Sequence, residues 1–140
     1  MTDGHIALLA ETLSGGGGAE RALMATAAAG RSLGQAWRLY APAWTVPAQA
    51  PSWVVPVPLR RRAKPWRVWD VAHALAPAAR QAGAHTVIAG GKLLHADLYW
   101  PHGGLHVAAL EANELDIVPD VEVPADTALE VAIERAQTGP

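Results

Sequence analysis

Four side chains that could accept a proton stand close together in the second half of the sequence. The twelve residues from 95 to 106 hold one aspartate and three histidines, namely His95, Asp97, His102 and His106. Carboxylate and imidazole groups are common general bases in enzymes. A β-hairpin that turns at 101–104 and exposes its imidazoles is the non-catalytic alternative. The Pro-His-Gly-Gly sequence of that turn does not place two histidines on one face of a helix, so we predict no metal site.

A second candidate site is the run of four glycines at 15–18. A glycine loop that leads into a helix exposes backbone N–H groups at the positive end of the helix dipole. Such groups bind a phosphate or a sugar hydroxyl. A flexible turn is the alternative, because a glycine loop without further motif residues is a weak signal.

Basic side chains form a third candidate site between residues 60 and 67, with Trp66 and Trp69 beside them. We define this basic patch as Arg60, Arg61, Arg62, Lys64 and Arg67. It could bind a phosphate-rich acceptor, an anionic membrane surface or nucleic acid, or it could be a solvated loop. Nucleic acid ranks below the others because the patch lacks the regular aromatic spacing of a groove that follows a strand.

The charge of the chain is unevenly distributed along its length. Residues 1–110 carry 10 Lys and Arg against 5 Asp and Glu, whereas residues 111–140 carry 1 against 8. We expect the acidic segment to face solvent, a basic partner or the basic patch of the same chain.

The elements that must position these residues begin with a strand, a glycine turn, a helix and a second strand over residues 6–42. The apolar run 6–10 has little alternation, which is typical of a parallel strand covered on both faces. Apolar residues then recur at helical spacing from Ala19, and Gly34 is placed to end that helix. This order is typical of the first unit of an α/β nucleotide-binding fold.

The later elements are shorter or interrupted. Prolines in 43–58 predict surface loop, with one edge strand in 53–58. A helix is predicted over 66–82, in which Pro77 should cause a kink or a break, and a buried strand over 86–89. A short strand pair at 115–123 precedes a final helix at 127–136. We expect the apolar face of that helix to dock on the sheet or on a partner; its members are Ala128, Leu129, Ala132, Ile133 and Ala136.

Composition restricts the class of protein. A chain of 140 residues is long enough for one domain with a single core. No apolar run approaches the roughly 20 residues that span a bilayer. The absence of cysteine excludes disulfides and thiolate catalysis. The first residues, MTDGH, have no features of a signal peptide, so a cytoplasmic location is expected.

Two blocks of the sequence resemble family 4 glycosyltransferases, which have the GT-B fold. SGGGGAERAL followed by AAGRSLGQAWRLYAP is similar to the start of these enzymes. The matching positions are Gly17, Gly18, Ala19, Glu20, Arg21, Leu33, Gly34, Leu39, Tyr40, Ala41 and Pro42; Gln35 stands where the family often has histidine. Residues 90–110 resemble the "aDvyrphGGvH" segment of a subset that includes lipopolysaccharide core transferases. The matching positions there are Ala96, Asp97, Tyr99, Pro101, His102, Gly103, Gly104 and His106.

The resemblance implies a three-layer, Rossmann-like α/β domain with a mostly parallel sheet, which is one half of a GT-B fold. That domain would span 1–112, with a proline-rich and basic insertion at 43–65, and an acidic segment at 113–140 would end in a helix. The resemblance implies Asp97 as the general base, with His106 as the second candidate. The implied substrate-binding residues are Gly16, Gly17, Gly18, Glu20, Arg21, His95, His102, Gly103 and Gly104.

The resemblance also implies partners. The nucleotide-sugar-binding domain of the family, with its E-x7-E motif, has no counterpart in these residues. We therefore predict an acceptor-side domain that has no cofactor of its own and that needs a donor-binding chain. The basic patch would face an anionic glycan or a lipid-linked acceptor, at the inner membrane surface. A non-catalytic α/β binding or assembly module derived from that fold is the alternative function, and a homo-oligomer is the alternative to a donor-binding partner chain.

Overall fold

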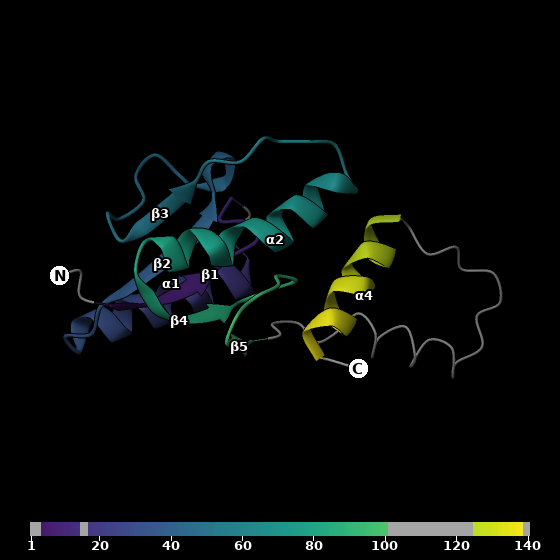
Figure 1. The fold of residues 1–140 in the computed structure, drawn as a ribbon. Coiled ribbons are helices and arrows are strands. Elements are labelled where there is room, and N and C mark those ends of the chain that lie inside the picture. The colour runs from purple at the N-terminus through teal and green to yellow at the C-terminus, as the bar shows by residue number, and fades with distance from the viewer. Residues whose placement is uncertain (1–3, 15–16, 101–124, 139–140) are drawn as a thin grey trace.

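The computed structural model describes residues 4–14, 17–100 and 125–138. Strands and helices alternate along the chain as far as β4, β5 follows β4 directly, and one further helix lies near the C-terminus (Figure 1). The elements are β1 (His5–Leu9), α1 (Gly18–Ser32), β2 (Trp37–Pro42), the short 3-10 helix η1 (Ala43–Thr45), β3 (Val54–Val57), α2 (Trp66–Gln81), β4 (Ala84–Ala89), β5 (Leu98–Tyr99) and α4 (Ala125–Thr138).

The strands form one sheet in the order β3-β2-β1-β4-β5. All neighbouring strands in it run parallel. The central strand β1 is buried along most of its length, as its unbroken apolar sequence predicts. β3 lies at one edge, where the lack of an N–H group at Pro56 is tolerated. The predicted α/β fold with a mostly parallel sheet is confirmed.

α1 covers one face of the sheet. Leu23 and Ala27 of this helix are buried against Leu8 and Leu39 of the two central strands. The packing requires a glycine at the end of β4: a Cβ atom at Gly90 would lie 2.7 Å from both terminal methyl carbons of Leu23. A larger residue at position 90 would therefore push α1 away from the sheet.

α2 covers the opposite face. Its buried residues Leu75, Ala76 and Ala79 pack against β1 and β4. The helix continues through Pro77, which is exposed, so this proline does not mark a break. A proline inside a helix removes one backbone hydrogen bond, here the one to the carbonyl of residue 73. The buried residues on either side of Pro77 hold the helix together across it.

The C-terminal helix α4 is present as predicted, but its partner is different from the expected one. Its described contacts are with α2 and the segment after β4, where Ile133 packs on Ala72 and Leu94. Ala132 and Ala136 of the predicted apolar face are exposed, whereas Glu134 is fully buried. The periodicity argument was right about Ile133 and wrong about Ala132 and Ala136, because polar groups, rather than these alanines, meet the segment after β4.

Polar contacts explain the burial of the other face of α4. The Gln137 side-chain amide donates to the carbonyl of Gly91 at 3.1 Å and also to that of Leu93. The Glu134 carboxylate lies 3.6 Å from the Lys92 ammonium group. The predicted strand pair at 115–123 lies outside the described residues. Among those that are described, no helix is both long and apolar enough to cross a membrane.

Candidate functional site

Two loops meet where the strand order of the sheet changes direction. β1 is followed in the sequence by β2 on one side of it, whereas β4 returns to its other side. In parallel α/β sheets, ligands bind outside the carboxyl ends of the strands at such a point. Here the Gly90 N–H donates to the Leu9 carbonyl at 2.9 Å. The Lys92 backbone N–H donates to the Glu11 carboxylate, so the loops after β1 and β4 are joined.

A hollow of about 360 Å³ opens beside these two loops. We call it the switch-point hollow. Residues from six parts of the chain line it: the loop after β1, η1, the segment before α2, the first turns of α2, the loop after β4 and, with one residue, α4. They are Glu11, Thr12, Ser14, Trp44, Thr45, Arg61, Lys64, Arg67, Val68, Val71, Lys92 and Glu130.

The hollow is polar and carries more cations than carboxylates. Four Lys and Arg residues line it, against the two glutamates Glu11 and Glu130. The Arg61 guanidinium lies 5.9 Å from the centre of the Trp44 ring, within the range of a cation–π contact. The hydroxyl groups of Thr12 and Ser14, which lie 2.9 Å apart and hydrogen-bond to each other, add uncharged polar groups, whereas the Thr45 hydroxyl donates to the Pro42 carbonyl at 2.8 Å. This combination suits a ligand that carries both hydroxyl and anionic groups.

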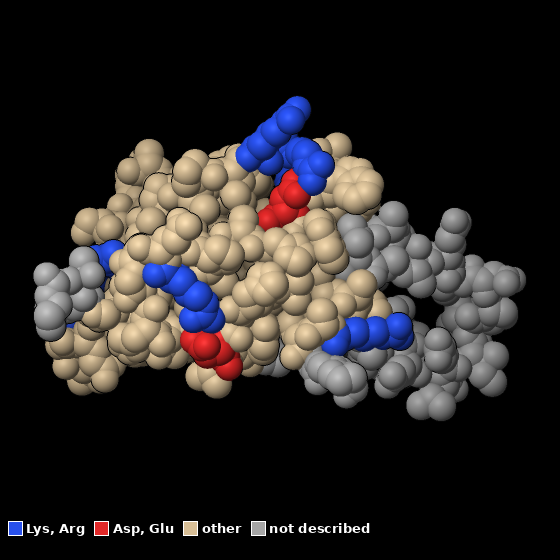
Figure 2. Space-filling view, in the orientation of Figure 1, with Lys and Arg blue, Asp and Glu red and all other residues tan. Residues whose placement is uncertain are grey.

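The structure divides the basic patch between two places. Arg61, Lys64 and Arg67 line the switch-point hollow, whereas Arg60 and Arg62 line a second depression on α2 with Trp69 and His73. Figure 2 shows Lys and Arg side chains gathered at the upper edge of the view, over the segment that leads into α2.

The Arg62 side chain forms an ion pair within the protein. Its guanidinium forms two hydrogen bonds of 2.5 Å with the Asp70 carboxylate. These bonds hold the pKa of Asp70 below its usual range and raise the pKa of Arg62. Arg62 is therefore less available to a ligand than Arg61 and Arg67, which line the hollow.

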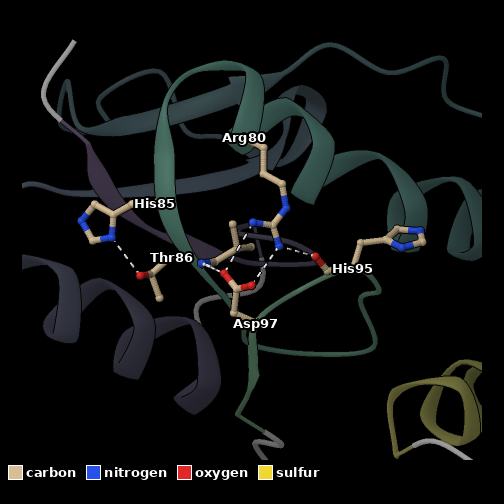
Figure 3. Close-up of polar contacts among 6 residues, drawn as sticks. Arg80, His85, Thr86, His95 and Asp97 are labelled. Atoms are coloured by element: carbon tan, nitrogen blue, oxygen red, sulfur yellow. Dashed lines mark hydrogen bonds and ion pairs between the residues drawn. The ribbon is translucent and has the colours of Figure 1, made fainter. Parts of the chain in front are cut away.

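Asp97 lies away from the hollow, between α2 and β4 (Figure 3). Its Oδ2 accepts the Val87 N–H at 2.8 Å, and the Arg80 guanidinium lies 3.3 Å from Oδ1. The Arg80 guanidinium also donates to the His95 carbonyl at 2.8 Å. The Val87 hydrogen bond, followed by the contacts with Arg80, lowers the pKa of Asp97. These contacts fasten β5 to the sheet, and the role of Asp97 as a general base stays a prediction.

We expect Asp97→Asn to remove an acid-sensitive part of the stability. Because the pKa of Asp97 is lowered in the folded state, its stabilising contribution is present above the unfolded-state pKa of about 3.9 and is lost as the pH falls through the lower, folded-state value. The side chain is 45% exposed, so solvent screening limits the contribution to about 1 kcal/mol. Urea unfolding at neutral pH and at pH values down to about 2 measures the difference between the two proteins.

The difference in unfolding free energy between the wild type and Asp97→Asn should be largest at neutral pH and should shrink below about pH 4. Arg80→Gln serves as the control, because it removes the partner of Asp97 and leaves the carboxylate. The two substitutions together should cost less than the sum of the single ones. A difference that stays constant over the whole pH range would contradict the assignment.

His95 also lies away from the hollow. Its ring is directed away from Asp97, and its Nε2 lies 3.0 Å from Nδ1 of His73 on α2 (Figure 3). The pKa of His73 is lowered, first by burial and then by the neighbouring His95. His85, at the start of β4, contacts the Thr86 hydroxyl through Nδ1 at 2.8 Å. The predicted substrate contact of His95 stays untested.

The described part of the glycine loop caps its own helix. The Gly17 N–H donates to the Glu20 carboxylate at 2.6 Å, so one amide that was predicted to bind a ligand is occupied. Glu20 and Arg21 line a separate groove between α1 and residues 47–54, with a volume of about 420 Å³. The other predicted site residues lie outside the described residues: Gly16, His102, Gly103, Gly104 and His106.

The sequence interpretation missed part of the lining of the hollow. Glu11, Thr12 and Ser14 follow β1 directly, and Lys92 follows β4. The rule that ligands bind after the carboxyl ends of parallel strands would have identified these four positions if it had been applied to the strands β1 and β4. Within the described ranges, no three histidine, aspartate or glutamate side chains are grouped as metal ligands.

Comparison with known proteins yields one informative likeness. No family model matches this chain, and no curated protein matches it. The chain is similar to the crystal structure of WaaG, a glycosyltransferase involved in lipopolysaccharide biosynthesis, with a TM-score of 0.71 and 18% sequence identity. The chain therefore has a glycosyltransferase-like fold. The match covers 94% of this chain and 35% of the WaaG chain, so this chain spans about a third of the length of its structural neighbour.

Proposed function

We propose that this chain is the acceptor-side half of a family 4 glycosyltransferase with the GT-B fold, and that the switch-point hollow binds the acceptor. The observation that carries the proposal is the position of the hollow at the carboxyl ends of β1 and β4, where α/β domains bind ligands. The likeness to WaaG, over 94% of the chain, supports a transferase origin of the fold.

The lining of the hollow suits a carbohydrate. Hydroxyl groups of Thr12 and Ser14 and the carboxylate of Glu11 can exchange hydrogen bonds with sugar hydroxyls, and the Trp44 ring offers an aromatic surface. The Lys92 backbone N–H orients the Glu11 carboxylate. We propose that Glu11 binds an acceptor hydroxyl group. Asp97 and His106 remain the predicted bases for deprotonating that group.

The proposed reaction needs a nucleotide-sugar donor, which a second Rossmann-like domain on a partner chain would hold. The basic residues that line the hollow suit the anionic group of a lipid-linked acceptor, and we propose that the chain works at the inner face of a membrane. The donor-binding partner chain and the membrane surface are both parts of the proposal.

Reconstitution of sugar transfer tests the proposal. The tagged chain is purified from its native host with any co-purifying chain, which mass spectrometry identifies. The pair is then assayed for transfer of a labelled sugar from nucleotide-sugars to the host glycolipid fraction. We expect a partner with a donor-binding domain and joint transfer activity. Glu11→Gln should lower kcat/KM about tenfold, through the loss of one charge-assisted hydrogen bond worth roughly 1.4 kcal/mol.

Glu20→Gln makes the same substitution in a glutamate outside the hollow, which the resemblance implies as a substrate-binding residue. Its amide oxygen still caps α1, so transfer should continue at the rate of the wild type if the hollow binds the acceptor, and should fall if the glycine loop binds it instead. A chain that purifies alone or as a closed homo-oligomer, without transfer activity, would contradict the proposal. That result would favour the non-catalytic assembly module.

A further inference from the structure

Two guanidinium groups that line the switch-point hollow have unoccupied hydrogen-bond donors among the described residues. Arg61 and Arg67 both line it, and neither guanidinium forms a hydrogen bond or an ion pair within the part of the chain that the structure describes. The Arg61 guanidinium lies over the Trp44 ring, 5.9 Å from its centre. Arg62, one residue away from Arg61, instead directs its guanidinium onto Asp70. The donors of Arg61 and Arg67 are therefore available to a ligand.

The start of α2 adds to the positive potential of the same place. Arg67 lies in the first turn of this helix, and Lys64 precedes it. The N-terminal end of a helix carries a partial positive charge, which carboxylates in the first turn usually offset. α2 is described along its whole length, and it has no acidic residue in that turn. Basic side chains at the positive end of a helix repel its dipole, and a bound anion would relieve this repulsion.

The carboxylates of the hollow do not cancel this potential. Glu11 accepts the Lys92 backbone N–H, and the Lys92 ammonium group lies 3.6 Å from Glu134 of α4. With Lys92 balanced by Glu134, the basic residues Arg61, Lys64 and Arg67 line the hollow against the two carboxylates of Glu11 and Glu130. The surplus positive charge lies on the α2 side, and the hydroxyls of Thr12 and Ser14 lie on the β1 side. The ligand that matches this arrangement carries an anionic group next to hydroxyl groups.

We infer that the switch-point hollow binds a phosphate group, with Arg61 and Arg67 as its direct ligands and Thr12 and Ser14 beside them for neighbouring hydroxyls. The guanidinium group suits phosphate because its planar N–H donors can bind two oxygens at once. That the phosphate belongs to a glycosyl acceptor rests on the proposed function. The phosphate site itself does not depend on transfer activity.

Arg60 provides a matched control for this site. It belongs to the same segment and carries the same charge as Arg61, but it lines the depression on the other side of the patch. Arg60→Gln therefore lowers the net charge of the protein by the same amount as Arg61→Gln or Arg67→Gln. A diffuse basic surface would respond alike to all of these substitutions, whereas a phosphate site in the hollow would respond only to the last two.

Titration calorimetry with the full chain tests the inference, using inorganic pyrophosphate and a hexose phosphate as probes. A flotation assay with phosphatidylglycerol vesicles forms a third arm. We expect Arg67→Gln and Arg61→Gln each to weaken binding about tenfold, which corresponds to roughly 1.4 kcal/mol, whereas Arg60→Gln should leave the affinity unchanged. Circular dichroism checks the fold of each variant. If Arg67→Gln fails to fold, Arg61→Gln and Arg67→Lys carry the test.

The three arms distinguish the sources of the phosphate. Tighter binding of the hexose phosphate than of pyrophosphate identifies a sugar phosphate, and binding to the vesicles alone identifies a lipid phosphodiester. Either result supports the phosphate site if Arg61→Gln and Arg67→Gln weaken it selectively. No saturable binding in any arm, or an equal loss in Arg60→Gln, would overturn the inference. Phosphate binding without sugar transfer would overturn only the proposed function.

Discussion

Replacing Leu75 with alanine should lower the free energy of unfolding by about 2–5 kcal/mol, the range measured when leucine is truncated in a protein core. Leu75 is 0% exposed and lies in the middle of the face that α2 presents to the sheet. The substitution removes apolar contacts and leaves a cavity between α2 and the sheet, which the packed residues around it cannot easily fill. Chemical denaturation followed by circular dichroism measures the loss.

Leu33→Ala is the matched control for this prediction. Leu33 follows the last residue of α1 and is 79% exposed, so the same truncation should change the stability by less than about 0.5 kcal/mol. Similar losses for the two variants would contradict the assignment of Leu75 to the core. The prediction also concerns the site, because Arg67 and Val71 reach the hollow from the same helix.

The local sequence was sufficient to predict the helices and strands in the central part of this fold. The apolar run that becomes β1, the helical spacing of α1 and the stripe Val71, Leu75 and Ala79 of α2 each lie within one element. Each therefore carries its own periodicity. The edge strand β3 was also predicted, because Pro56 and Pro58 within 53–58 disfavour both a helix and a central strand there. Burial on one or both faces was enough to select these elements.

The candidate site depends on pairs that periodicity cannot predict. Glu11 and Lys92 stand 81 positions apart in the sequence and meet only because β4 returns to pair with β1. Asp97 was chosen for its residue type and its motif, and nothing near it in the sequence indicated that Arg80, on α2, would reach its carboxylate. Sequence reasoning identified residue types with suitable chemistry, whereas the topology decided which of them share a surface.

The C-terminal helix shows the same limit in another form. Treating alanine as apolar predicted that Ala132 and Ala136 would be buried. The surface that α4 meets includes the carbonyls of Gly91 and Leu93 and the Lys92 ammonium group. The side chains of Gln137 and Glu134 bind these groups, so α4 turns part of its polar side toward the segment after β4. The partner surface determined which face was buried, and no pattern within the helix contained that information.

Ile133→Asp should release α4 from the domain while the sheet stays folded. Ile133 is 0% exposed and packs on Ala72 and Leu94. An ionised carboxylate cannot stay at that position without a partner, so the helix should detach rather than bury it. Burial of an isoleucine side chain contributes about 2–3 kcal/mol, and hydrogen exchange of the α4 amides should therefore speed up roughly a hundredfold. A detached helix of this length is marginal in water, so helical circular dichroism should also decrease.

Ala132→Asp separates docking from helix propensity. It places the same residue one position earlier on the same helix, where the side chain is exposed, so the protection of α4 should change little. The β1 amides should keep their protection in both variants, because β1 lies in the centre of the sheet, away from α4. Equal losses of α4 protection for the two variants would show that Ile133 does not anchor the helix. Selective loss in Ile133→Asp would establish that α4 docks as a separate unit, and it would identify the contact that holds Glu134 beside Lys92.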